Sequence, residues 1–166
     1  AGVPLAGRDL LLLGAGGAAA GALGSLLAER PRRIAVVNRT FERAQALVQR
    51  HAAIAAQHGV ELVALEQQAV DEDFDVVINA TASSLAGAEV PGPGRVLRTG
   101  SLAYDMMYGP AGQGFMQWAE QHGATARDGL GMLVEQAAES FALWRGVRPP
   151  SAQVLNELRA HIAQGG

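Results

Sequence analysis

An apolar run that ends in small residues is the first feature of this chain with chemical meaning. Leu10–Leu13 is followed by Gly14 and Gly16, and then by Ala19. This order is typical of a β-strand that turns tightly into a helix: the first glycine permits the turn, the second admits a pyrophosphate, and a small third residue allows close helix–sheet packing. The N–H groups that begin such a helix attract phosphate oxygens, because the helix dipole is positive there. The segment predicts a dinucleotide pyrophosphate site.

The end of the next apolar run indicates which dinucleotide. An NAD site usually has Asp or Glu there, to accept hydrogen bonds from the adenine ribose. This chain has Asn38, Arg39 and Thr40 after Ile34–Val37, with Arg43 one helical turn further on. Two guanidinium groups and a hydroxyl group would hold a 2′-phosphate that a carboxylate would repel.

The two arginines and the threonine therefore predict NADP as the cofactor. Hydrogen bonds to charged groups contribute about 1.5–3 kcal/mol each, and two of them in the lower half of that range would favour NADP over NAD by roughly two to three decades. The alternative is that Arg39 and Arg43 are solvated charges at the start of a surface helix.

The composition narrows the class of protein. The 166 residues are 49% hydrophobic, which suits one sizeable core, and the net charge of −3 gives no general case for nucleic acid. Cys is absent and the four histidines lack metal-ligand spacing, so no metal is expected. No apolar stretch reaches the ~18–20 residues that span a bilayer, and no signal segment is visible, so no membrane contact and a cytoplasmic location are expected. All thirteen basic residues are arginine, which excludes any lysine acid or base within this chain.

Alternating strand and helix patterns predict an α/β fold of the Rossmann type, a doubly wound parallel sheet of about six strands with helices on both faces. The expected strands are Asp9–Leu13, Arg33–Val37, Glu61–Leu65, Phe74–Asn79, Ser101–Met106 and Ala124–Arg127. The expected helices are 18–28, 40–57 with Thr40 as N-cap, 113–121, and two C-terminal helices within 130–164, the last capped by Ser151.

Other expectations concern the loops and the packing. Ala82–Arg98 is expected to be a loop with a short helix, because it is rich in Gly, Pro and Ser. Trp118 and Trp144 are expected to be structural, as part of the core. Leu130, Leu133, Val134, Ala137, Ala138, Phe141 and Ala142 follow helical spacing and predict an apolar stripe.

Several segments together resemble the nucleotide-binding domain of the shikimate dehydrogenases. They are the glycine turn Gly14–Ala18, the clamp Asn38–Ala44, the loop Asn79–Thr81, the Asp-Met-x-Tyr segment Asp105–Tyr108 and the helix start Asp128–Gln136. Members of that family reduce 3-dehydroshikimate to shikimate with NADPH, in aromatic amino-acid and chorismate biosynthesis. The resemblance covers the whole chain in order.

The resemblance also implies roles for residues. Met106 and Gly129 would approach the nicotinamide, and Tyr108 and Gln136 would reach the substrate. Gln136 shares a helix side with Met132, so it can face a cleft. The residues expected to bind the cofactor are Gly14, Ala15, Gly16, Gly17, Ala18, Asn38, Arg39, Thr40, Arg43, Asn79, Thr81, Met106 and Gly129. For Asn79 and Thr81 an alternative is that they order their own loop, since such side chains commonly bond nearby backbone.

In this family a separate N-terminal domain binds most of the substrate and supplies a Lys–Asp pair for proton transfer. A chain without lysine cannot contain that pair. Residues 1–166 are therefore expected to be the cofactor domain alone, with no catalytic residue of its own. The chain is expected to bind NADP(H) but to be inactive by itself, and to share the shikimate or 3-dehydroshikimate substrate with the absent N-terminal domain. The alternatives are a non-catalytic NADPH-sensing module, the nucleotide domain of a glutamyl-tRNA reductase-like enzyme, and a quinate-preferring relative that uses NAD.

Overall fold

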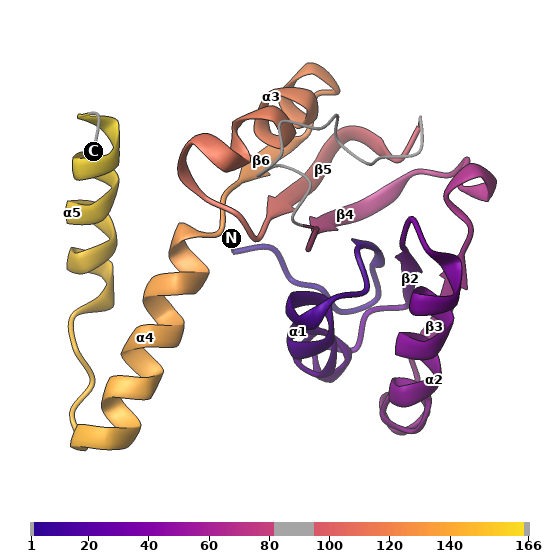
Figure 1. Cartoon of the computed structure of the whole chain (residues 1–166), viewed down its shortest axis with the longest axis horizontal. Coiled ribbons are helices and arrows are strands. Elements are labelled where there is room, and N and C mark those ends of the chain that lie inside the picture. Colours follow the sequence, from indigo (N-terminus) through magenta and orange to yellow (C-terminus); the bar gives the residue numbers. More distant parts are fainter. Residues whose placement is uncertain (1, 82–94, 165–166) are drawn as a thin grey trace.

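One parallel sheet organises the computed structural model, which describes residues 2–81 and 95–164. The strands are β1 (Asp9–Leu13), β2 (Arg33–Val37), β3 (Glu61–Leu65), β4 (Phe74–Asn79), β5 (Leu97–Asp105) and β6 (Thr125–Arg127). Their spatial order is β3-β2-β1-β4-β5-β6, and every neighbouring pair is parallel. This is the predicted doubly wound topology, shown in Figure 1.

Helices follow the strands because apolar positions change from continuous runs to helical spacing. They are α1 (Gly17–Ala28), α2 (Phe41–His58), α3 (Gln113–Gln121), α4 (Leu130–Arg145) and α5 (Ser151–Ala163), with 3₁₀ turns η1 (Gln67–Ala69) and η3 (Gly109–Gly112). No helix of the described residues combines the length and apolar character needed to cross a membrane.

The core lies on both faces of the sheet. Leu10 and Leu12 of β1 pack with α1 and α2 on one face, whereas Leu11 and Leu13 pack on the other face with residues of α3. Successive side chains of a strand point to opposite faces, so a strand that is apolar throughout must be covered on both. The prediction of helices on both faces is confirmed.

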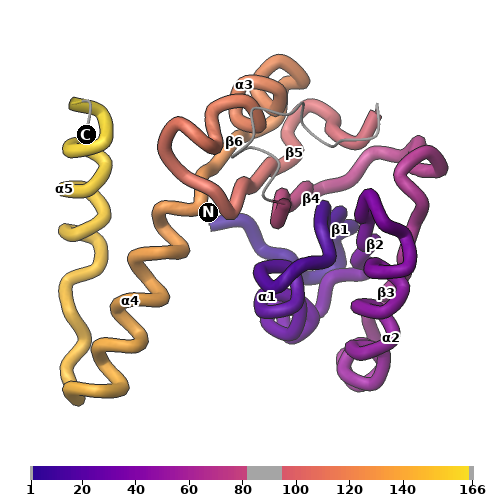
Figure 2. The backbone as a smooth tube through the Cα atoms, viewed as in Figure 1, coloured from indigo at the N-terminus to yellow at the C-terminus, as the bar shows by residue number. Residues whose placement is uncertain are grey.

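The strands end level with one another at their carboxyl ends. Leu13 of β1 is opposite Val37 of β2 and Asn79 of β4, and Asn79 is opposite Asp105 of β5. The loops that leave β1, β2, β4 and β5 therefore start side by side along one edge. Figure 2 shows the path of the backbone through these strands and loops.

α4 and α5 run side by side in opposite directions, away from the rest of the molecule (Figure 1). Arg159 of α5 forms an ion pair with Asp128, 2.8 Å between nitrogen and oxygen, just before α4. Arg148, in the connection between the helices, bonds Glu135 at 2.8 Å and also Glu139. These ion pairs link the two helices and their connection. They add little to the free energy of folding, because surface ion pairs are weak.

The start of β5 corrects one prediction. The predicted loop includes Leu97 and Arg98, but β5 begins at Leu97, which pairs with Phe74. Gly100 adopts φ 88°, and the Ser101 hydroxyl donates to the Phe74 carbonyl oxygen at 2.7 Å. The hydrogen bond of Ser101 thus spans the irregular pairing between β4 and β5. Gly100 and Ser101 had favoured a loop in the sequence-based prediction because both are common in loops. Residues 82–94 of the predicted loop lie outside the described residues.

The structure also tests two predicted helix caps and the predicted packing of one tryptophan. Ser151 does not cap α5: Pro150 occupies the N-cap position, and no side chain bonds there. Thr40 does occupy the N-cap of α2, but its side chain makes no capping bond. Trp118 is partly buried beside Phe115, as expected.

The predicted stripe of α4 is buried only in part. Trp144 is 77% exposed, so its assignment to the core is wrong in this chain. Leu133 and Phe141 are also exposed, and the buried members are Leu130, Val134 and Ala138. The reason is that α4 leaves the sheet after its first turns, so the sheet does not cover its later apolar side chains, and α5 lies along one side of the helix (Figure 1).

Candidate functional site

The site lies where the order of the strands reverses. The chain passes from β1 outward to β2 and β3 and then returns to β4 beside β1, which leaves a crevice at the carboxyl ends of β1 and β4. The residues one step beyond the paired strand ends are Asn38, Gly14, Ala80 and Met106. Residues from distant parts of the sequence are thereby brought to one edge.

The turn after β1 accepts only glycine at position 14. The φ of Gly14 is +104°, and a Cβ atom there would lie 2.9 Å from the carbonyl oxygen of Ala80. Its N–H donates to the Val37 carbonyl at 2.7 Å. By contrast, a Cβ on Gly16 or Gly17 would meet no atom within 4 Å, so the start of α1 faces open space.

The first turn of α1 is electrostatically suited to an anion. It contains no acidic residue, and its N-cap Gly16 offers no side chain to bond the free N–H groups. Those N–H groups and the helix dipole favour a negatively charged group. Gly17 and Ala18 lie in this turn, and Ala15 directly precedes its N-cap. Ala19 is fully buried against the sheet, which confirms the close packing expected of it.

Asn38 connects the glycine turn to the loop after β2. Its amide oxygen accepts from the Ala15 N–H at 3.2 Å, and its amide nitrogen donates to the Thr40 carbonyl at 2.8 Å. Both polar ends of the side chain are thus occupied within the protein. These two bonds hold the glycine turn and the loop after β2 together, and the cofactor contact expected of Asn38 stays a prediction.

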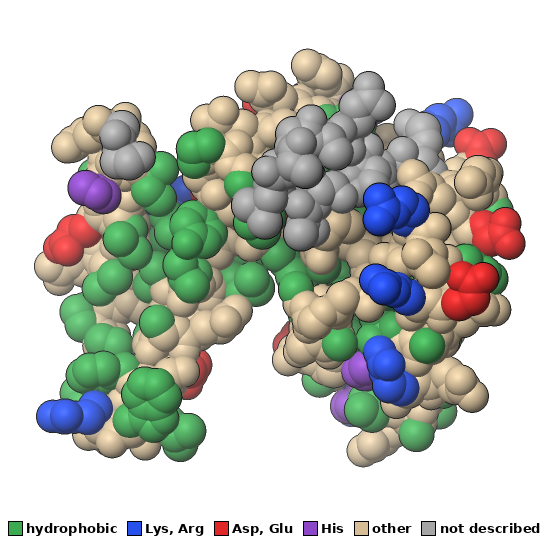
Figure 3. Space-filling model, viewed as in Figure 1, with side chains coloured by type: hydrophobic (Ala, Val, Ile, Leu, Met, Phe, Trp, Pro, Cys, Tyr) green, Lys and Arg blue, Asp and Glu red, His purple; other side chains and the backbone are tan. Residues whose placement is uncertain are grey.

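Arg39 and Arg43 are exposed beside this loop, and neither forms an ion pair with another described residue. Basic side chains gather over the α2 side of the molecule in Figure 3. Charges without a partner in the described part of the chain are available to an anionic ligand.

Asn79 and Asp105 form a buried polar pair between the ends of β4 and β5. Asn79 Nδ2 donates to Asp105 Oδ1 at 3.2 Å, and Asn79 Oδ1 accepts from the N–H and the hydroxyl group of Thr81 at 3.1 and 2.7 Å. These bonds order the loop that Asn79 and Thr81 form, and the cofactor contact expected for the two residues stays a prediction.

The environment of Asp105 perturbs its acidity. Burial raises the pKa of the Asp105 carboxyl group, although hydrogen bonds from the Met107 N–H and from Asn79 act in the opposite direction. Its Oδ2 atom has no hydrogen-bond partner among the described residues. From the sequence, Asp105 is predicted only as part of the Asp-Met-x-Tyr segment, with no role of its own.

Gly129 is required by the loop after β5. A Cβ on Gly129 would lie 2.2 Å from the Met106 carbonyl oxygen, closer than any real contact. The Gly129 N–H donates to the Met107 carbonyl at 2.8 Å. The start of α4 is thus packed directly on the backbone of the segment that carries Met106.

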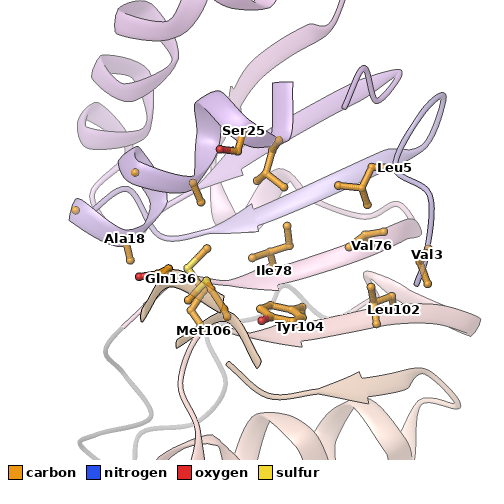
Figure 4. Close-up of a pocket in the computed structure, with 15 residues that line it drawn as sticks. Val3, Leu5, Ala18, Ser25, Val76, Ile78, Leu102, Tyr104, Met106 and Gln136 are labelled. Atoms are coloured by element: carbon orange, nitrogen blue, oxygen red, sulfur yellow. The ribbon is translucent and has the colours of Figure 1, made fainter. Parts of the chain in front are cut away.

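A cleft of about 780 Å³ opens between α1 and α4, over β4 and β5. Figure 3 shows the molecule hollowed between these two parts. Met106, Ala18 and Gln136 lie close together at one end of it in Figure 4, and Val3 and Leu5 lie at the other. Met132 also lines it, so the shared helix side of Met132 and Gln136 faces a cleft as predicted.

Two tyrosines differ in their relation to this cleft. Tyr108 does not line it, and its side chain is 42% exposed at the start of η3. Tyr104 does line it, and burial raises the pKa of its phenol, with the Asp128 carboxylate acting in the same direction.

Within residues 2–81 and 95–164, no group of three or more acidic or histidine side chains could hold a metal ion.

The open sheet, its reversal point and the glycine turn define a Rossmann-like α/β domain. Comparison with known proteins places it more narrowly. The model of the family described as Shikimate / quinate 5-dehydrogenase matches residues 2–89, and that of the Shikimate 5'-dehydrogenase C-terminal domain matches residues 129–159. The chain belongs to the shikimate/quinate 5-dehydrogenase family, which confirms the resemblance.

Individual relatives agree with this placement. The chain is 74% identical over 165 residues to a protein of Acidovorax ebreus (strain TPSY) named shikimate dehydrogenase (NADP(+)), covering 99% of this chain and 58% of the relative. Among solved structures, the Ael1 enzyme from Pseudomonas putida matches with a TM-score of 0.80 and 41% identity, over 95% of this chain and 56% of the other. The shikimate 5-dehydrogenase of Thermus thermophilus in complex with NADP(H) and shikimate matches with a TM-score of 0.72 and 28% identity, over 96% and 57%. The chain thus spans little more than half the length of these relatives.

Proposed function

We propose that this chain is the NADP(H)-binding part of a shikimate dehydrogenase, which reduces 3-dehydroshikimate to shikimate. The observation that carries the proposal is the pair Arg39, in the loop after β2, and Arg43, in the first turn of α2. Both are exposed, neither forms an ion pair with a described residue, and no acid stands where an NAD site would have one. The glycine turn beside them would take the pyrophosphate. Relatives named as NADP(+) enzymes and a neighbour solved with NADP(H) and shikimate support the same cofactor.

Each part of the dinucleotide has candidate residues. Arg39, Thr40 and Arg43 would bind the 2′-phosphate, and the N–H groups of Ala15–Ala18 the pyrophosphate. Met106 and the backbone at Gly129 would lie beside the nicotinamide, which supplies the hydride when bound. Asn38, Asn79 and Thr81 would act by holding these loops in place.

Turnover needs more than this chain provides. Tyr108 and Gln136 would contact the substrate, but a proton must also reach the carbonyl oxygen, and the chain contains no lysine to deliver it. We therefore expect the 166-residue chain to bind NADP(H) without oxidising shikimate. The Lys–Asp pair would belong to the additional length that the relatives possess.

The exposed apolar surface of α4 and α5 supports such a second domain. Leu143, Trp144 and Val147 are more than half exposed at 84%, 77% and 64%, and Figure 3 shows hydrophobic side chains spread over both helices. Contiguous exposed apolar surface marks an interaction site. We infer that a substrate domain, corresponding to the remaining length of the relatives, packs on this surface and closes over the cleft.

Calorimetric titration of the 166-residue chain with NADP⁺ and with NAD⁺ tests the cofactor assignment. We expect NADP⁺ to bind more tightly by about two to three decades. Preference for NAD⁺ would favour a quinate-type enzyme, and failure to bind either would contradict the proposal. In parallel, shikimate and NADP⁺ are added to the chain and absorbance of NADPH is followed, where a measurable rate would disprove the expected inactivity.

A further inference from the structure

Asp105 is the only charged side chain that is fully buried in residues 2–81 and 95–164, with 0% exposure. Burying a carboxylate is unfavourable unless hydrogen bonds compensate. None of the binding roles proposed above uses this residue. Its position at the end of β5, directly before Met106, suggests what the burial achieves.

The contacts of Asp105 join two loops. Its Oδ1 atom accepts from Asn79 Nδ2 at 3.2 Å, across the sheet, and from the Met107 N–H at 2.9 Å, in its own loop. The Met106 N–H in turn donates to the Asn79 carbonyl oxygen at 2.9 Å. The ends of β4 and β5 are thereby connected through both backbone and side chains.

Met106 is held at the centre of these contacts. On one side its N–H is fixed by Asn79, and on the other its carbonyl group is packed on Gly129. Its side chain extends into the cleft near Ala18 and Gln136, as Figure 4 shows. Moving the Asp105 carboxyl group would release the Met107 N–H and with it the conformation of the loop around Met106.

We propose that Asp105 is a positioning residue: its Oδ1 atom, shared between β4 and the loop after β5, holds Met106 in place for the nicotinamide half of the dinucleotide. This inference rests on the proposed function, since it requires a dinucleotide at this edge of the sheet. A merely structural role would instead affect the whole molecule and both halves of the ligand alike.

Methionine methyl NMR on the 166-residue chain separates these possibilities. The chain has four methionines, Met106, Met107, Met116 and Met132, and the Met106 signal is assigned with Met106→Leu. Two ligands are compared: NADP⁺, and adenosine 2′,5′-bisphosphate, which keeps the 2′-phosphate but lacks the nicotinamide. In the wild type, only NADP⁺ should shift the Met106 signal.

The variants Asp105→Ala and Asp105→Asn give opposite expectations. Asp105→Ala removes the acceptor, so the Met106 shift with NADP⁺ should be lost and the affinity for NADP⁺ should fall about tenfold. Affinity for adenosine 2′,5′-bisphosphate should not change. Asp105→Asn keeps an acceptor oxygen at the same place and should restore both properties.

Ser101→Ala is the matched control. Ser101 is also buried on β5, at 2% exposure, and its hydroxyl group also donates to β4, but to Phe74, at the opposite end of β4 from Asn79. The control should lose stability while keeping the Met106 shift and both affinities. If it loses the Met106 shift as Asp105→Ala does, the effect is structural and the proposal is wrong.

Other outcomes also overturn the proposal. They are an unchanged Met106 shift in Asp105→Ala, equal weakening of both ligands, or an Asp105→Asn protein that behaves like the alanine variant. If Asp105→Ala does not fold, Asn79→Ala replaces it, and an unchanged Met106 shift there contradicts the proposal. Failure of the wild type to bind NADP⁺ would instead contradict the proposed function, so the two failures are distinguishable.

Discussion

Gly129 packs so closely on Met106 that its Cα hydrogen occupies the only space available: a Cβ atom would lie 2.2 Å from the Met106 carbonyl oxygen. The backbone conformation of Gly129, φ −79° and ψ −1°, is open to any residue. The requirement for glycine is therefore one of contact with a neighbouring loop and not one of backbone freedom.

Gly129→Ala should accordingly separate α4 from the loop after β5. We expect the free energy of unfolding to fall by about 1–3 kcal/mol, as for other overpacked sites, and the affinity for NADP⁺ to fall because Met106 moves. Gly131→Ala is the control, since its Cβ would make only an ordinary 3.9 Å contact with Leu155. Alanine within a helix should raise stability there by about 0.5–1 kcal/mol. Urea unfolding and calorimetry measure both, and equal behaviour of the two variants would contradict the contact argument.

The clamp at the end of β2 should act on one phosphate only. Replacing both Arg39 and Arg43 with Gln should weaken NADP⁺ binding by about two to three decades and leave NAD⁺ binding unchanged. Arg50→Gln is the control, because Arg50 lies on the same side of α2 two turns further on and is also exposed. Calorimetric titration of each variant with NADP⁺ and NAD⁺ measures the dissociation constants. An unchanged NADP⁺ dissociation constant in the double variant would show that Arg39 and Arg43 do not select NADP.

Asn38 should affect both cofactors equally. Asn38→Ala leaves the Ala15 N–H and the Thr40 carbonyl without their partner, so we expect a loss of about 1–2 kcal/mol in stability. Because the glycine turn would loosen, binding of NADP⁺ and of NAD⁺ should weaken by similar factors. The same titrations measure this, and a loss confined to NADP⁺ would show that Asn38 contacts the 2′-phosphate instead.

Asp105 should make stability depend on pH. Burial raises the pKa of its carboxyl group in the folded chain. Its favourable contribution is therefore complete below the unfolded-chain pKa of about 3.9 and is lost as pH rises through the folded pKa.

The measurement compares wild type with Asp105→Asn by urea unfolding between about pH 4 and pH 8. The difference in free energy of unfolding should favour the wild type most in acid, fall as pH rises, and then level off. Taking the difference cancels the other carboxyl groups that both proteins share. A difference that is flat or that rises with pH would contradict the assigned direction.

Much of the fold was predictable because runs of apolar residues and turn glycines along the chain indicate its strands and turns. Leu10–Leu13 and Ile34–Val37 are apolar on both faces, which requires a strand covered on both sides, and Gly14 follows where only glycine tolerates the turn. The start of β5 was missed because it is recognised by its pairing with Phe74 of β4, which the Ser101 hydroxyl group also contacts, and no local pattern contains such contacts between segments.

The sequence by itself determined the strand–helix alternation, the glycine turn and the absence of an acid after β2, because each depends on neighbouring residues in the chain. Only the tertiary structure decided that Asn79 and Asp105 share a hydrogen bond, that Gly129 rests on Met106, and that Trp144 is exposed. These relationships arise from strand order and register, which bring together residues that are far apart in sequence. Periodicity along the chain has no information about which partner a buried polar group will meet.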